Sequence, residues 1–563
     1  MTAKPFALDP FTAEVIKDGL VAIGEEMFIA MARTSMSPII YEVLDYATGL
    51  TDARARLLTQ GNGVAGFIGV LTYSVQSVLD KFGEEGLRPG DIVMTNDPYS
   101  GGGTHLSDVC LVMPIFYEGE LIAFAANKAH WTEVGGMAPG SWTTDSTEIF
   151  QEGLQFPCIK AFVNDEPLPQ IVDLIHVNVR TPDMSLGDFY AQAASLRLAG
   201  RRIVELCGKY GVGAVKEAMA WLLEDGRQRA RAALARLPKG TFVAEDTIDD
   251  DGISDHPIPV RVEVTITDDE FVVDFSQMPP QVAGPINSSR TGTFSALRCA
   301  WIAIASPQSQ INEGIFDPVR LVVPDGTIIT AQRPAPTSTY WETLLYSLDL
   351  IWKALAPAVP ERLPAGHYNT VGASITTTFH AVNDRFTILV EPNMGGWGAC
   401  VDRDGESGLF SSMNGETFNL PVEVTEQAYG LRVDEYAFNP EPGGEGEHRG
   451  GRGVIRSYRI LHEDGGTITI TLGRHKFPSW GVDGGHDGSR NYAQVIRSDG
   501  SAKEPTGKTA RLPLAKGDLL RIVCGSGGGW GDPKRRPVEK VRTDVRAGLM
   551  SKEIAREVYG VDI

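Results

Sequence analysis

The chain has 563 residues, which is enough for two to four domains or for one large multilobed body. Hydrophobic residues make up 42% of the chain and charged residues 22%, the ordinary balance of a globular protein. The formal net charge of -21 argues against nucleic acid or an anionic membrane as the main partner, because both attract a basic surface. No apolar run of 18 residues occurs, so no transmembrane helix is expected.

The six cysteines are spread along the chain, and no CxxC pair occurs among them. This usage predicts reduced, buried thiols, because a disulfide framework or a thiolate metal site needs a recognisable cysteine spacing. The segment 1–20 contains no continuous apolar stretch, so no signal peptide is expected. Together these features predict a cytoplasmic protein.

Helical spacing of apolar residues is the dominant pattern in the first half of the chain. Helices are expected at 13–34, 70–82, 184–237, 294–305 and 341–356. Gly211 and Gly213 divide the third of these into at least two long helices, because glycine disfavours a helix interior. The glycine-rich segment 59–69 is expected to be a loop.

The composition changes near Lys239, where alternation of apolar and polar residues replaces helical spacing. Strands are expected within 241–285 and at 454–461, 466–472 and 492–496. We therefore predict an α/β (mixed α+β) fold, a large multilobed chain whose C-terminal part is rich in strands and glycine. The predicted parts are an N-terminal α/β lobe with the metal site at 1–239, a β-rich lobe at 240–535 and a helical tail at 536–563.

The stretch 96–136 carries the densest set of potential ligands in the chain. It opens with a turn and a glycine run and continues in two apolar, strand-like runs, 110–117 and 121–126. Glu118-Gly119-Glu120 joins these runs and is typical of a hairpin turn. The two outer ends of a hairpin lie side by side, so residues that flank these runs are expected to meet.

His105 and Asp108 precede the first strand of this hairpin, and His130 follows the second. We expect the three side chains to meet at its open end. Two imidazoles and a carboxylate are a common ligand set for a catalytic divalent metal that keeps one position open. The alternative is that the histidine and aspartate, three residues apart, only cap their own turn.

Three other carboxylates are candidates for the same site. Asp45 lies among apolar residues, and a buried carboxylate needs a cation, a metal or several donors. Glu133 and Glu152 follow close behind His130, and either can serve as a general base; exposed loop acids are the simpler explanation. No catalytic triad can be read from the sequence, because Gly525-Ser526-Gly527 lacks the spacing of a nucleophile elbow.

Short motifs in a fixed order run along nearly the whole chain. They are Asn96-Asp97-Pro98, Gly102-Gly103-Thr104-His105-Leu106 with Asp108, His130 with Glu133-Val134-Gly135-Gly136, Asn312-Glu313-Gly314, Gly395-Gly396-Trp397-Gly398 and Arg449-Gly450-Gly451. Each motif is weak alone, but the ordered set resembles the hydantoinase B family. That family includes B subunits of ATP-dependent hydantoinases and lactamases, the C-terminal half of 5-oxoprolinase, and subunits of acetone and acetophenone carboxylases.

The resemblance implies a divalent metal, zinc or manganese, on His105, Asp108 and His130, with Asp45 as a further carboxylate ligand. It also implies a hydantoinase A-type partner subunit, which binds ATP and magnesium and phosphorylates the oxygen of a carbonyl or amide. The implied activity is hydrolysis of the activated cyclic amide, with Glu133 or Glu152 accepting the proton of the attacking water.

Two departures from the family pattern leave the substrate open. Trp131 stands where many relatives have a second histidine, and Glu133 stands where many have aspartate. The main alternative is a subunit of an ATP-dependent ketone carboxylase, and Trp131 and Trp142 hint at a pocket for a bulky substrate. A third alternative is a structural subunit that the metal stabilises, with all catalysis on the partner.

Overall fold

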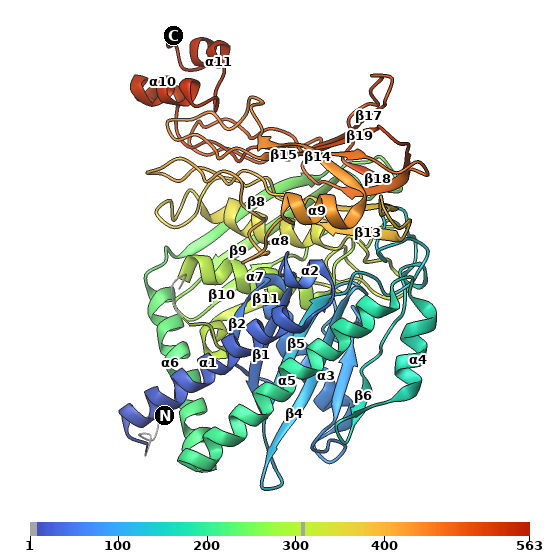
Figure 1. Cartoon of the computed structure of the whole chain (residues 1–563). Coiled ribbons are helices and arrows are strands. Elements are labelled where there is room, and N and C mark those ends of the chain that lie inside the picture. Colours follow the sequence, from blue (N-terminus) through green and yellow to red (C-terminus); the bar gives the residue numbers. More distant parts are fainter. Residues whose placement is uncertain (1–7, 306–309) are drawn as a thin grey trace.

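The computed structural model describes residues 8–305 and 310–563. Residues 1–7, part of the segment for which no signal peptide is expected, lie outside the described residues. The N-terminal half forms a sheet under long helices, and the C-terminal sheets and helices stack on one end of it (Figure 1). Among the helices of the described part, none combines the length and apolarity needed to cross a membrane.

The first sheet has seven antiparallel strands in the order β2-β1-β5-β4-β3-β6-β7. The strands are β1 (Tyr46–Asp52), β2 (Leu57–Gly63), β3 (Ile92–Thr95), β4 (Asp108–Tyr117), β5 (Glu120–His130), β6 (Ile159–Val163) and β7 (Glu166–Pro167). The expected hairpin is therefore confirmed, as the central pair β4–β5. Successive residues of β4 alternate between two cores, with Leu111 in one and Val112 in the other, so both faces of the sheet are covered.

Long helices cover both faces of this sheet. Helices α1 (Pro10–Thr34) and α5 (Pro182–Tyr210) pack on one face, and α3 (Ala65–Phe82) packs on the other. Helix α1 begins at Pro10, where the Asp9 carboxylate accepts a hydrogen bond from the backbone N–H of Thr12 at 3.0 Å. The predicted division of 184–237 is confirmed, because Gly211, with φ 84°, separates α5 from α6 (Val212–Ala235).

The expectation of a loop at 59–69 was wrong, because β2 and the start of α3 occupy this segment. Its glycines serve close packing. A Cβ atom at Gly61 would lie 2.6 Å from the backbone oxygen of Gly24, so only glycine lets β2 lie directly against α1. The glycines of this segment therefore indicate close packing between β2 and α1, and they do not indicate a loop.

The rest of the described chain contains three four-stranded sheets, in the orders β11-β10-β9-β8, β13-β12-β16-β18 and β14-β15-β19-β17. Their strands are β8 (Gly240–Ile248), β9 (Ile258–Ile266), β10 (Phe271–Asp274), β11 (Val319–Val322), β12 (Ala373–Phe379), β13 (Phe386–Glu391), β14 (Leu431–Phe438), β15 (Val454–Ile460), β16 (Gly466–Thr471), β17 (Tyr492–Ile496), β18 (Lys508–Leu514) and β19 (Leu519–Val523). The remaining helices are α2 (Pro38–Tyr41), α4 (Pro169–Asn178), α7 (Arg290–Ala305), α8 (Trp341–Leu355), α9 (Val422–Tyr429), α10 (Val538–Arg546) and α11 (Lys552–Glu557). The predicted strands at 454–461, 466–472 and 492–496 are confirmed.

Helix α8 lies in the interior, and nearly all of its side chains are buried. It contacts α7, β8 and β9, and it belongs to one hydrophobic core that extends from Ile16 to Trp530. The parts predicted at 1–239 and 240–535 therefore share a core. Helices α10 and α11 have a small core of their own, which includes Val541 and Met550.

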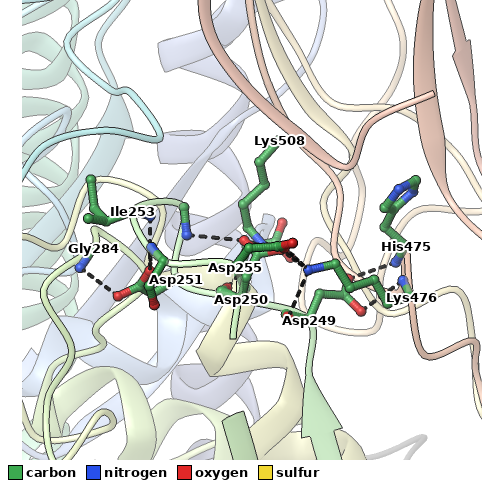
Figure 2. A network of polar contacts seen from close by, with 12 residues as sticks. Asp249, Asp250, Asp251, Ile253, Asp255, Gly284, His475, Lys476 and Lys508 are labelled. Atoms are coloured by element: carbon green, nitrogen blue, oxygen red, sulfur yellow. Dashed lines mark hydrogen bonds and ion pairs between the residues drawn. The ribbon is translucent and has the colours of Figure 1, made fainter. Parts of the chain in front are cut away.

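Consecutive aspartates attach the loop after β8 to the C-terminal part of the chain (Figure 2). The Asp249 carboxylate accepts hydrogen bonds from the backbone N–H groups of His475 at 2.7 Å, Lys476 at 2.9 Å and Phe477 at 3.1 Å. Asp250 forms ion pairs with Lys476 at 3.0 Å and with the ammonium group of β18 residue Lys508 at 3.1 Å. This network joins the sheet of β8–β11 to the sheet that contains β16 and β18.

Replacing Asp249 with alanine is expected to destabilise the protein, because three backbone N–H groups lose their acceptor. The expected loss in the free energy of unfolding is about 1–3 kcal/mol, measured as a lower thermal midpoint. Asp268→Ala is the matched control, because this side chain is 92% exposed. Equal midpoints for the two variants would contradict a structural role for Asp249.

Candidate metal centre

The register of the central hairpin builds the site. Asp108, the first residue of β4, lies directly opposite His130, the last residue of β5. His105 comes from the loop before β4, which the Asn96 side chain holds in place by donating hydrogen bonds to the backbone oxygens of Leu106 at 2.7 Å and Leu154 at 2.9 Å. The three predicted ligands therefore meet at the open end of the hairpin.

His105, Asp108 and His130 form one compact cluster. Each offers a ligand atom, and these atoms all lie within 4.8 Å of one another. The His105 Nε2 atom is 3.1 Å from Asp108 Oδ1, and the two imidazole centroids are 5.0 Å apart. The side chains are 1%, 0% and 5% exposed, so the cluster is shielded from solvent.

The donor set fits a divalent metal. Asp108 Oδ1 and His130 Nδ1 are buried and have no hydrogen-bond partner among the described residues, an arrangement that folded proteins rarely tolerate. Burial lowers the pKa of His130 to about 4, so its imidazole is neutral at neutral pH. Burial raises the pKa of Asp108, but His105, His130 and Lys128 outweigh it and hold that pKa at about 2. A neutral imidazole and an ionised carboxylate are the forms that bind metals.

Residues from the distant segment 338–340 orient these ligands. The His105 Nδ1–H donates to the backbone oxygen of Ser338 at 3.1 Å, which leaves Nε2 free to bind an ion. The second oxygen of Asp108 accepts hydrogen bonds from the Tyr340 hydroxyl at 3.1 Å and from the Thr104 hydroxyl. Ser338 and Tyr340 were not predicted, because no pattern in the sequence connects them with a loop more than 230 residues earlier.

Asp45 lines the same cavity as the cluster. Its backbone oxygen accepts the N–H of His130 at 3.0 Å, and the preceding Leu44 has a φ of 62°. Its carboxylate is outside the compact group of three, and burial together with Asp108 raises its pKa well above the usual range. A cation at the cluster would relieve this repulsion, so the position fits a fourth ligand, the second carboxylate of the set.

The cavity beside the cluster measures about 60 Å³ and has aromatic walls that include Phe67, Trp142 and Trp341. The Trp142 and Trp341 rings pack edge to face at 5.3 Å. Trp131, by contrast, is fully buried in the core and donates its indole N–H to Gln192 at 2.8 Å. Of the two tryptophans noted in the sequence, Trp142 is therefore the one that lines this cavity among the described residues.

Glu133 and Glu152 are near the cluster but are not among the described residues that line its cavity. Glu133 is buried and forms an ion pair with Arg180, whose backbone N–H also donates to it at 2.7 Å. Glu152 accepts the backbone N–H groups of Thr337 and Ser338, each at 3.0 Å, and burial raises its pKa to about 8. Glu152 thus fixes the backbone of Thr337 and Ser338, and the Ser338 backbone oxygen in turn orients His105.

Glu391, at the end of β13, is a cavity carboxylate that no sequence pattern singled out. It accepts the backbone N–H of Leu420 at 2.8 Å and the hydroxyl of Tyr458, and it lies 3.2 Å from the guanidinium of Arg456. These contacts occupy both of its oxygens and fix its position in the cavity wall.

Loss of one ligand is expected to abolish metal binding. Elemental mass spectrometry of the purified protein should give about one divalent ion per chain, and His130→Ala should lose it because the ligand set then keeps only one imidazole. His176→Ala is the matched control, since His176 is exposed on α4. A wild-type complex that is folded, active and free of metal would contradict the site.

The model of the hydantoinase B/oxoprolinase family matches residues 9–533 of the chain. A putative B subunit of a D-/L-hydantoinase from Pseudomonas sp. (strain NS671) is 31% identical, over 99% of this chain and 95% of that protein. The beta subunit of the caprolactamase of Pseudomonas jessenii is 30% identical, over 99% of this chain and 96% of that protein. Both names describe one subunit of an enzyme with several.

Two solved structures share the fold. The ATP-dependent caprolactamase from Pseudomonas jessenii superimposes with a TM-score of 0.91, covering 99% of this chain and 97% of that one at 28% identity. An acetone carboxylase chain also gives a TM-score of 0.91, covering 98% of this chain and 80% of that one, but its 21% identity shows a common fold alone. The family match over nearly the whole chain and the agreement in fold lead to one conclusion: the chain belongs to the hydantoinase B/oxoprolinase family.

Proposed function

We propose that the chain is the metal-dependent subunit of an ATP-dependent cyclic amide hydrolase of the hydantoinase, lactamase or oxoprolinase type. Its substrate is a cyclic amide that a hydantoinase A-type partner subunit has phosphorylated with ATP. The observation that carries the proposal is the buried cluster of His105, Asp108 and His130, in which two ligand atoms lack a hydrogen-bond partner among the described residues and which lines a cavity.

The comparisons support hydrolysis ahead of ketone carboxylation. The hydantoinase and caprolactamase subunits, named for enzymes that act on cyclic amides, are about as long as this chain and are 31% and 30% identical to it. The acetone carboxylase resembles it in fold at 21% identity. Carboxylation of a ketone is therefore the second candidate.

His105, Asp108 and His130, with Asp45 as a fourth ligand, would hold zinc or manganese. When bound, such an ion supplies Lewis acidity and lowers the pKa of a bound water toward ~7. The chain itself orients the ligands through Ser338, Thr104 and Tyr340. Trp142 and Trp341 form walls of the cavity that exclude bulk water. The activated substrate is therefore protected from attack by water that the cluster does not orient.

The partner's phosphorylation solves the chemical difficulty of the reaction. An unstrained amide is a poor electrophile because its nitrogen donates electron density to the carbonyl. Transfer of a phosphoryl group to the amide oxygen gives an imidate-like carbon with a good leaving group. Water then adds to this carbon at the cluster, and the C–N bond of the adduct breaks as the ring nitrogen takes up a proton. A second water hydrolyses the resulting acyl phosphate, which releases the carboxylate and phosphate.

The decisive experiment uses the chain co-purified with its ATP-binding partner. Ring opening of lactams, hydantoins and 5-oxoproline is followed with ATP, alongside ketones with ATP and bicarbonate. We expect ATP-dependent ring opening, and we expect His105→Ala to reduce it by about a thousand-fold or more while assembly and ATP hydrolysis persist. Carboxylated ketone as the product would favour the second candidate, and loss of assembly in the variant would favour a structural metal.

A pair of substitutions at Glu152 separates a proton acceptor from a positioning residue. Glu152→Ala leaves two backbone N–H groups without an acceptor and should weaken metal binding about 10- to 100-fold, measured by competition with a chelator. Glu152→Gln keeps one acceptor oxygen and should retain metal affinity and turnover. If both variants lose turnover while their metal affinity is unchanged, Glu152 is instead the general base. Glu166→Gln is the control, because the Glu166 side chain is exposed.

A further inference from the structure

A second cavity, of about 860 Å³, lies beside the metal cavity. The two share a wall made of consecutive residues. Ser412 lines the large cavity, whereas the next two residues, Met413 and Asn414, line the metal cavity. Likewise, Ala65 lines the large cavity and the next residue, Gly66, lines the metal cavity.

A serine, a histidine and an aspartate form a line that ends at this cavity. The Ser412 hydroxyl oxygen is 3.3 Å from His367 Nε2, and His367 Nδ1 is 3.6 Å from Asp349 Oδ1. Asp349 belongs to α8, His367 to the segment that follows it, and Ser412 to a turn before α9. Three separate segments thus place the groups in the order that nucleophilic catalysis by serine requires.

Two atoms of this line have no other partner. Asp349 Oδ1 and His367 Nδ1 are both buried and lack a hydrogen-bond partner among the described residues, although they face each other. The second oxygen of Asp349 is held by the Arg474 guanidinium at 2.6 Å and by the Trp480 indole N–H at 2.9 Å. The carboxylate is therefore fixed with one oxygen free for the imidazole.

The positions of Asp349 and Ser412 favour one tautomer of His367. With the proton on Nδ1, next to the carboxylate, Nε2 carries the lone pair and faces the Ser412 hydroxyl. The Trp397 ring lies 5.6 Å from the imidazole and restricts its rotation. His367 and Asp349 are each 1% exposed, whereas Ser412 is partly exposed, so the hydroxyl is the member that a substrate can reach.

We propose that Ser412 is an activated nucleophile and that the large cavity is a second catalytic site, which hydrolyses carboxylic esters. The Ser412 oxygen bonds to the ester carbonyl carbon while its proton passes to His367 Nε2. The bond from that carbon to the alkoxy oxygen breaks, and the leaving alcohol takes the proton from His367. Water then hydrolyses the acyl-serine by the same proton path, which releases the carboxylic acid and restores Ser412.

The walls of the cavity indicate the class of ester. Trp352, Trp397, Ile304 and Leu363 supply an aromatic and aliphatic surface for the acyl group. The indole N–H of Trp352 is a buried donor with no hydrogen-bond partner in the described part of the chain. Burial raises the pKa of Cys299, which also lines the cavity, to about 12, so its thiol does not compete as a nucleophile.

The test is covalent labelling of the full-length chain with a fluorophosphonate probe, followed by peptide mass spectrometry. We expect one adduct, on Ser412, and none in Ser412→Ala. His367→Ala should label at least ~100-fold more slowly, because an unactivated serine reacts poorly. Ser411→Ala is the matched control, since it removes a neighbouring serine outside the line.

A second assay separates this site from the metal centre. Hydrolysis of p-nitrophenyl butyrate and benzoate should persist in His130→Ala and disappear in Ser412→Ala, with both variants folded by thermal unfolding. Asp349→Asn tests positioning, and it should slow labelling at least ~10-fold while Ser412 remains the labelled residue. Folded wild-type protein that gives no Ser412 adduct, or ester hydrolysis that survives in Ser412→Ala, would overturn the proposal.

Discussion

The pairing of Asp108 with His130 at the open end of the β4–β5 hairpin is the constraint on which the candidate metal centre depends. Both strands are buried on both faces, so a shift of one residue would move every side chain into the wrong core. The hydrophobic register that stabilises the sheet therefore also aligns the ligands. A site built this way is rigid, because displacing a ligand requires moving the central strands.

The distant part of the chain completes this site from the other side. Segment 337–340 supplies the Ser338 oxygen for His105 and the Tyr340 hydroxyl for Asp108, and Glu152 holds that segment by its backbone. The segment leads directly into α8, whose first residue, Trp341, is a wall of the cavity. The shared core between the two halves of the chain is thus what brings the ligands and their supports together.

Helix α8 connects the metal centre with the second cavity. Trp341 at its start lines the cavity of the first, and Asp349, about two turns later, lies 3.6 Å from His367 beside the second. Several buried polar atoms around this helix lack partners among the described residues, including Glu342 Oε2 and the Tyr346 hydroxyl. Buried polar atoms of this kind need a partner from outside the protein chain, such as a buried water or an ion.

The sequence by itself determined the hairpin, the long helices and the meeting of His105, Asp108 and His130, because these depend on local periodicity and on residues fewer than thirty positions apart. It misjudged the glycines of 59–69, of which Gly61 allows close contact with α1 and Gly69 with α7. Only the tertiary structure revealed Ser338, Tyr340 and Glu391 at the metal cavity and the line of Ser412, His367 and Asp349. These groups come from separate segments, and no pattern along a chain encodes the packing that makes them neighbours.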